Sequence, residues 1–154
     1  MIKVLFVCHG NICRSPMAEA VFKNLVDKAG LAEQIEVDSA GTSGYHAGEA
    51  AHPGTLRVLA EHGIRYDGRS RQLTRNDLKT FDYIVAMDEE NLENIQSLGA
   101  SSGRVALLLD YAPHASEREV PDPFYNGAFQ RVYNLVLEGG HGLLDRIRKD
   151  NKLP

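Results

Sequence analysis

The first thirty residues leave few folds open to this chain. Residues 2–7 are a near-continuous apolar run, which is typical of a buried parallel strand. The next segment, from Cys8 to Ser15, is rich in small and polar residues, and apolar residues then recur at helical spacing until Gly30. A strand that passes through such a loop into a helix presents inward-facing N–H groups and a helix N-terminus. Together these groups form a binding site for an anion.

This loop carries a cysteine and an arginine at the spacing Cys-x5-Arg, in Cys8 and Arg14. A thiolate can attack phosphorus, and a guanidinium can donate two parallel hydrogen bonds to phosphate oxygens. The helix N-terminus and Arg14 favour the thiolate, and we expect the Ser15 hydroxyl to donate to it. Gly10 and Asn11 tolerate the positive φ that turns N–H groups inward. The predicted catalytic residues are Cys8 and Arg14, and the predicted phosphate-binding residues are His9, Gly10, Asn11, Ile12, Cys13 and Ser15.

Apolar runs alternate with helical patterns along the rest of the chain. Strands are predicted over residues 2–7, 35–38, 82–87 and 105–109. Helices are predicted over residues 15–29, 53–62, 92–98 and 126–149, with a loop and a short helix over 64–76. Three poor helix formers, in Gly139-Gly140-His141-Gly142, indicate a kink or break in the last helix.

This alternation predicts an α/β fold, with a four-stranded parallel sheet and helices on both faces. The carboxyl ends of parallel strands meet at one edge of a sheet, where such folds bind their ligands. We therefore expect the loops at residues 8–15, 39–46 and 110–125 to lie together at that edge.

Length and charge argue against several classes of protein. A chain of 154 residues, 43% of them apolar, can bury one core, so we predict a single domain over 1–154. The net charge of −4, with acidic and basic residues interspersed, argues against a nucleic-acid-binding face. The early apolar run is too short for a signal peptide or a membrane span. Two cysteines without other disulfide signals indicate a reducing compartment. We expect a cytoplasmic monomer or weak dimer, without nucleic-acid or membrane partners.

The opening Cys-x5-Arg-Ser-Pro motif resembles that of the low-molecular-weight protein tyrosine phosphatases. The resemblance extends to Asp38-Ser39-Ala40-Gly41-Thr42-Ser43 and to Asp122-Pro123-Phe124-Tyr125. It implies the flavodoxin-like fold of phosphotyrosine protein phosphatase I and hydrolysis of phosphotyrosine monoesters through a cysteinyl-phosphate intermediate. The implied substrates are tyrosine-phosphorylated proteins and aryl phosphates, with no cofactor and no metal.

An acid is expected in the site because the tyrosine leaving group has a pKa of about 10. Asp122 lies between two prolines, which stiffen its loop, and the resemblance assigns it the role of general acid and base. Asp88 also follows a predicted strand and is the competing candidate. We favour a different role for Asp88, as the N-cap of the next helix.

The resemblance implies roles for several further residues. Ser39 is implied to hold Asn11, and an aromatic wall around the phosphotyrosine ring is implied for Tyr45, Phe124 and Tyr125. Several members of the family place a histidine that supports the loop asparagine shortly after a His-Gly-Ile turn. In this chain Gly68 stands at that place, so the support is missing or comes from elsewhere.

The two cysteines predict a redox response. A reactive thiolate is oxidised first to the sulfenic acid, which a nearby thiol can trap as a disulfide. Cys8 and Cys13 lie five residues apart around one tight loop. We therefore predict reversible inactivation through a Cys8–Cys13 disulfide, with a buried and inert Cys13 as the alternative.

Other functions stay open at this point. A related protein arginine phosphatase shares the loop but tends to carry threonine in place of Ile12, whose apolar side chain favours an aromatic ring. A thioredoxin-coupled arsenate reductase needs further cysteines, and none follows Cys13. Zinc sites usually need four ligands, and no second pair accompanies Cys8, His9 and Cys13. A phosphate-binding module would not require a nucleophile together with a separate acid.

Overall fold

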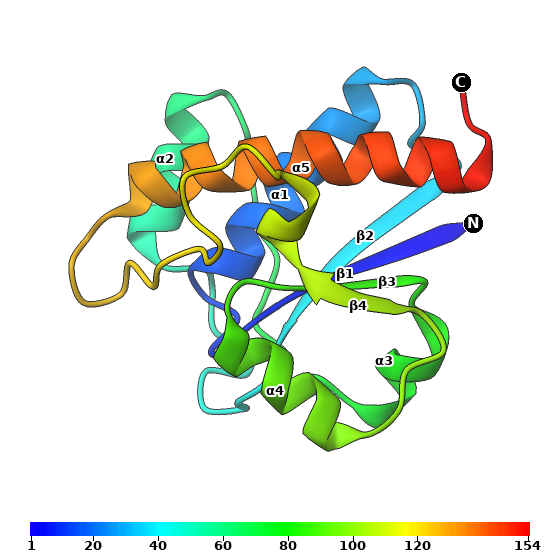
Figure 1. Cartoon of the computed structure of the whole chain (residues 1–154). Coiled ribbons are helices and arrows are strands. Elements are labelled where there is room, and N and C mark those ends of the chain that lie inside the picture. Colours follow the sequence, from blue (N-terminus) through cyan, green and yellow to red (C-terminus); the bar gives the residue numbers. More distant parts are fainter.

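The strands form one parallel sheet of four, in the order β2-β1-β3-β4 (Figure 1). The computed structural model describes residues 1–154 and gives the strands as β1 Ile2–Cys8, β2 Ile35–Gly41, β3 Tyr83–Ala86 and β4 Arg104–Leu107. The predicted four-stranded parallel sheet is therefore confirmed. The predicted bounds of β2 are too short, because Ser39, Ala40 and Gly41 stay paired with the end of β1 instead of entering the loop.

The last strand ends earlier than predicted. After Leu107 the chain turns into a 3-10 helix, η1 (Leu108–Tyr111). The Asp110 carboxylate closes this turn by accepting a hydrogen bond from the Leu107 N–H at 3.2 Å. The two leucines that were predicted to extend β4 are therefore buried as part of η1.

Helices cover both faces of the sheet, as predicted. The first face carries α1 (Arg14–Lys28), α2 (Pro53–Glu61) and α5 (Phe129–Asn151), and the second carries α3 (Arg75–Thr80) and α4 (Glu89–Leu98) (Figure 1). Side chains of β1 alternate between two cores. Val4 and Phe6 belong to the larger core with α1 and α5, and Leu5 and Val7 belong to the smaller one on the opposite face.

The long helix α5 runs unbroken through its glycines. The predicted kink or break at residues 139–142 is wrong, because the glycines let η1 approach the helix. A Cβ at Gly139 would lie 2.6 Å from Leu108 Cγ, and one at Gly142 would lie 1.8 Å from the Tyr111 carbonyl oxygen. Close packing of η1 thus offsets a helix-propensity cost of about 1 kcal/mol for each glycine.

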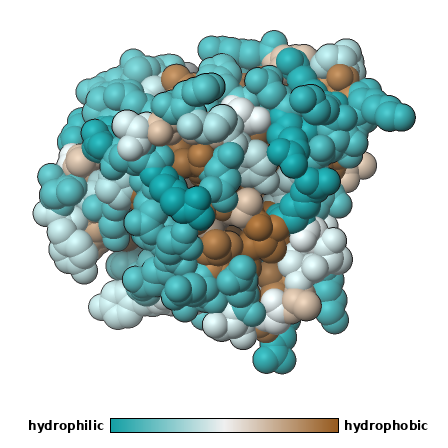
Figure 2. Space-filling model, in the orientation of Figure 1, coloured by the Kyte–Doolittle hydropathy of each residue, from teal (hydrophilic) through white to brown (hydrophobic).

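The carboxyl ends of the strands lie at one edge of the sheet, and loops from distant parts of the chain meet there (Figure 1). The Thr42 N–H donates to the Cys8 carbonyl at 2.9 Å, and the Val120 N–H donates to the Met87 carbonyl at 2.9 Å. The face of the molecule in Figure 2 is mainly hydrophilic, with apolar residues gathered near the middle of the view. None of the helices has the length and apolar character that a membrane span requires.

Candidate active site

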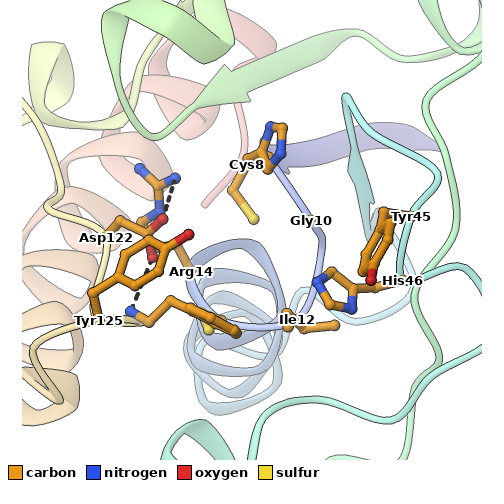
Figure 3. Close-up of a pocket in the computed structure, with 11 residues that line it drawn as sticks. Cys8, Gly10, Ile12, Arg14, Tyr45, His46, Asp122 and Tyr125 are labelled. Carbon is orange, nitrogen blue, oxygen red and sulfur yellow. Dashed lines mark hydrogen bonds and ion pairs between the residues drawn. The ribbon is translucent and has the colours of Figure 1, made fainter.

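A cavity of about 290 Å³ opens at this edge, and the loop between β1 and α1 forms its floor (Figure 3). The cavity brings together residues from three parts of the chain, namely Cys8, His9, Gly10, Ile12, Cys13, Arg14, Tyr45, His46, Asp122, Phe124 and Tyr125. The Cys8 sulfur points into the space between Arg14 and Asp122 on one side and Ile12 and His46 on the other. Three predicted residues, Asn11, Ser15 and Ser39, lie buried outside this lining.

Asn11 holds the loop in its bent form. It adopts the left-handed conformation, with φ of 56°, as predicted. Its amide nitrogen donates to Ser39 Oγ at 3.0 Å and to Ser15 Oγ at 2.7 Å, and its amide oxygen accepts from the Arg71 N–H at 3.0 Å. The side chain is thereby fixed from three directions, and the Asn11–Ser39 contact that the family resemblance implied is present.

Gly10 has a different role from the predicted one. It is not among the residues with positive φ, so the inward turn of the loop depends on Asn11 alone. A Cβ at Gly10 would instead lie 3.0 Å from His46 Cδ2. The glycine therefore provides room for the His46 ring beside the loop.

Ser15 is oriented toward the cysteine. The Ser15 and Cys8 side-chain atoms, Oγ and Sγ, are 3.1 Å apart, and both residues are buried. Ser15 Oγ already accepts from Asn11, so its own hydrogen is free for Cys8; the other acceptor, the Ala40 carbonyl, is 3.5 Å away. We assign the hydrogen of this pair to Ser15, which can therefore stabilise a Cys8 thiolate.

The Arg14 guanidinium is buried and anchored at one end. Its Nη1 donates to Asp88 Oδ2 at 2.5 Å and to the Val120 carbonyl at 3.1 Å, while Nη2 is 3.8 Å from Asp122 Oδ2. Burial lowers the Arg14 pKa, but the charges of Cys8, Asp88 and Asp122 outweigh it and raise this pKa above its usual value. Arg14 therefore remains a cation at the wall of the cavity.

Asp88 combines two roles. Its Oδ1 accepts from the Asn91 N–H at 2.8 Å, so it is the N-cap of α4 as predicted. Its other oxygen takes the hydrogen bond from Arg14. This second contact was not predicted, because it joins residues that are far apart in the chain.

Asp122 lies beside Arg14 at one side of the cavity, with its side chain 42% exposed (Figure 3). Its Oδ1 accepts from the Phe124 N–H at 3.0 Å, which leaves Oδ2 on the side of Arg14. One oxygen is therefore fixed by the loop and the other faces the space where a phosphate ester would bind.

Aromatic rings form the rim of the cavity. Tyr45 and Tyr125 are 84% and 89% exposed, and Phe124 packs edge-to-face on Tyr125 with ring centroids 5.0 Å apart. The His46 ring joins them, 4.9 Å from the Tyr45 ring and 6.4 Å from the Phe124 ring. Sequence reasoning missed His46, although its place directly after Tyr45 was an available signal.

The second cysteine differs chemically from the first. Both thiols are free and buried. Burial and the nearby charges of Cys8 and Asp122 raise the pKa of the Cys13 thiol to about 12, so it stays protonated near neutral pH. No group of three or more His, Cys, Asp or Glu side chains is arranged to hold a metal ion.

The sequence and the fold can be compared with those of known proteins. The family model described as low molecular weight phosphotyrosine protein phosphatase matches residues 3–153. The chain belongs to this family. One similar member is the low molecular weight protein-tyrosine-phosphatase YfkJ of Bacillus subtilis. It is 46% identical over 99% of this chain and 100% of that protein.

Solved structures of related phosphatases have the same fold as this chain. The crystal structure of YfkJ superposes with a TM-score of 0.94 and covers 97% of this chain and 96% of that one. The crystal structure of a Drosophila arginine phosphatase is 33% identical, has a TM-score of 0.89 and covers 96% of this chain and 98% of that one. The fold is therefore shared by proteins named for different phosphorylated side chains.

Proposed function

We propose that this phosphatase hydrolyses phosphotyrosine in proteins and aryl phosphates through a cysteinyl-phosphate intermediate. The observation that carries the proposal is the arrangement of four groups around one cavity. A cysteine with a serine donor lies at the floor, an anchored arginine forms one wall, and an aspartate lies beside that arginine, with its Oδ2 3.8 Å from the arginine Nη2. A binding module would have no use for the nucleophile and the acid together.

In the first step the Cys8 thiolate attacks phosphorus. A sulfur–phosphorus bond forms, the bond from phosphorus to the tyrosine oxygen breaks, and Asp122 gives its proton to the departing phenolate. The phosphate oxygens accept hydrogen bonds from Arg14 and from the N–H groups of the loop. The neighbouring Asp88 keeps the guanidinium in place, so no reorientation is needed as charge moves onto these oxygens.

In the second step a water molecule attacks the phosphorylated cysteine. The Asp122 carboxylate takes a proton from this water, the sulfur–phosphorus bond breaks, and inorganic phosphate leaves. Ser15 donates to the thiolate that is released. The enzyme returns to its starting state with Cys8 ionised and Asp122 protonated.

The aromatic rim supports phosphotyrosine as the substrate. Cys8 is 2% exposed at the floor, whereas Tyr45 and Tyr125 stand at the rim, so the substrate side chain must reach inward between the rings. A phenyl ring meets apolar and aromatic surface from Ile12 and Phe124 along that path. A charged guanidinium would lose its hydration there without a matching acceptor from Ile12.

Phosphoarginine is the second candidate because a solved neighbour is an arginine phosphatase. The test is competition among matched phosphotyrosine, phosphoarginine and phosphoserine peptides on one enzyme sample. We expect kcat/KM to be highest for phosphotyrosine and Ile12→Thr to raise the phosphoarginine value relative to it. Cys8→Ser is the control and should lose turnover of every peptide. A phosphoarginine value equal to or above that for phosphotyrosine would overturn the substrate assignment.

A further inference from the structure

A half-buried carboxylate lies behind the phosphate-binding loop. Glu19 of α1 accepts two hydrogen bonds on Oε1, from Ser39 Oγ at 2.6 Å and from the Tyr66 hydroxyl at 2.8 Å. Ser39 is also the residue that accepts from the Asn11 amide at 3.0 Å. A continuous chain of hydrogen bonds thus connects Tyr66, outside the cavity, to the loop that forms its floor.

The direction of each hydrogen bond in this chain is determined by the next. Ser39 has one hydrogen and uses it on Glu19, so its oxygen can only accept from Asn11. The Arg71 N–H fixes the Asn11 amide oxygen, which keeps the amide nitrogen toward the two serines. Glu19 Oε1 is therefore the acceptor at the end of this series of hydrogen bonds, and it accepts more strongly when Glu19 is ionised.

Glu19 depends on its two donors to remain ionised. Burial raises the Glu19 pKa above its usual value, and the hydrogen bonds from Ser39 and Tyr66 act in the opposite direction. Asp38 on β2 raises this pKa and Lys23 on α1 lowers it. The charged residues that line the cleft next to Glu19 are Lys23, Asp27, Arg65 and Asp67.

Gly68 has no side chain, and this leaves room for the Tyr66 phenol. A Cβ at Gly68 would lie 2.3 Å from the Tyr66 hydroxyl oxygen and 2.5 Å from its Cζ. Any larger residue at position 68 would push the phenol away from Glu19. Burial and the Glu19 charge also raise the Tyr66 pKa, so this phenol remains protonated and able to donate.

We propose that Tyr66 and Glu19 are positioning residues for the phosphate-binding loop. Tyr66 keeps Glu19 ionised, Glu19 takes the Ser39 hydrogen, and Ser39 then holds Asn11 in the left-handed conformation that the cradle needs. This inference rests on the proposed function, in which the loop binds the phosphoryl group. The competing view is that the Tyr66–Glu19 contact only stabilises the fold.

The test compares Tyr66→Phe with Tyr83→Phe. Both exchanges remove a hydroxyl that donates to a carboxylate at 2.8 Å, but Tyr83 bonds to Asp150, away from the cavity. Binding of sulfate, which does not titrate in this range, is measured by protection of Cys8 against iodoacetamide. Cys13, with its raised pKa, stays unreactive. We expect Tyr66→Phe to weaken sulfate binding about three- to tenfold and Tyr83→Phe to leave it unchanged.

The pH profile separates positioning from stabilisation. Loss of the Tyr66 donor raises the Glu19 pKa further, so in one pH interval Glu19 is protonated in Tyr66→Phe and still ionised in the wild type. The loss of sulfate affinity should be greatest in that interval. In a Glu19→Gln background no carboxyl remains to titrate, so Tyr66→Phe should cause the same change at every pH.

The outcomes are distinct. Two results would overturn the inference and leave the proposed function standing. One is equal sulfate affinity in Tyr66→Phe and Tyr83→Phe, and the other is a loss of sulfate affinity in Tyr66→Phe that is the same at every pH. A wild-type enzyme whose Cys8 is not protected by sulfate would instead contradict the proposed function. If Tyr66→Phe does not fold by circular dichroism, Gly68→Ala displaces the same hydroxyl and is expected to give the same pH-dependent loss.

Discussion

At the scale of single residues, the charged groups of the cavity are held in place by the fold. Arg14 is buried and uses one nitrogen on Asp88 and the Val120 carbonyl, which leaves the other nitrogen toward Asp122. A guanidinium fixed in this way need not reorient when phosphate arrives, and that preorganisation is a main source of electrostatic catalysis.

Asp122 gives the sharpest test at this scale. We expect Asp122→Asn to lower kcat by about 10²–10⁴, since an amide cannot supply the proton. The loss should be larger for phenyl phosphate than for para-nitrophenyl phosphate, whose leaving group needs less protonation. Steady-state kinetics across a series of aryl phosphates measures this dependence.

Asp88 provides the matched control for this series. Asp88→Asn removes a charge beside the same guanidinium, but its loss of kcat should not vary with the leaving group, because Asp88 faces Arg14. If the loss of kcat were equal across the series for Asp122→Asn but varied with the leaving group for Asp88→Asn, the general acid would be Asp88 and not Asp122.

At the scale of elements, Gly139 and Gly142 of α5 pack against η1, the 3-10 helix that follows β4. Gly142→Ala would place a methyl group 1.8 Å from the Tyr111 carbonyl oxygen, a contact that η1 can relieve only by moving. We expect this exchange to lower the free energy of unfolding by about 1–3 kcal/mol. Urea denaturation followed by circular dichroism measures the change.

Gly140→Ala is the control within the same helix. Its Cβ would lie 3.2 Å from Leu25 Cδ1, the flexible end of a side chain, and alanine favours the helix by about 1 kcal/mol. The exchange should therefore change stability little or increase it. A similar loss for both variants would mean that η1 packing does not explain these glycines.

Sequence reasoning found the elements that depend on local pattern. The strand, loop and helix around Cys8 and Arg14 follow from apolar runs and small residues, and Asp122 followed from the family resemblance. It could not find the contact between Asp88 and Arg14, or Tyr66 as the partner of Glu19, because these pairs meet only when the chain is folded. The Cys8–Cys13 disulfide stays a prediction.

The glycines of α5 also show where prediction from the sequence failed, because a break was predicted and the helix is continuous. Their helix propensity is low, and propensity alone indicated a break over residues 139–142. The helix continues because η1 packs against its glycines, and neither the 3-10 helix nor its position was visible in the pattern of residues 105–111.

At the scale of the whole molecule, the two cores share one strand. Successive residues of β1, from Val4 to Val7, enter opposite cores, and the next residue is Cys8. Loss of either core therefore leaves one side of the strand that leads into Cys8 unpacked. We predict that the chain unfolds in a single cooperative transition.

Tyrosine fluorescence and circular dichroism test this prediction in urea, since the chain has 6 tyrosines and no tryptophan. The two curves should coincide, and inorganic phosphate should move both midpoints upward together, because it binds only the folded form. Cys8→Ser should keep the phosphate effect and Arg14→Lys should reduce it. Separate midpoints for the two probes would contradict cooperative unfolding.

The exposure of the rim has a consequence for how this family can diversify. Tyr45 and Tyr125 are almost fully exposed, so replacing them removes little buried surface and should leave the fold intact. The floor beneath them, from Cys8 to Arg14, is tied to the rest of the molecule and tolerates little change. New preferences for phosphorylated partners can therefore arise at the rim while the reaction is inherited unchanged, and a library randomised at those two tyrosines should lose few members to misfolding.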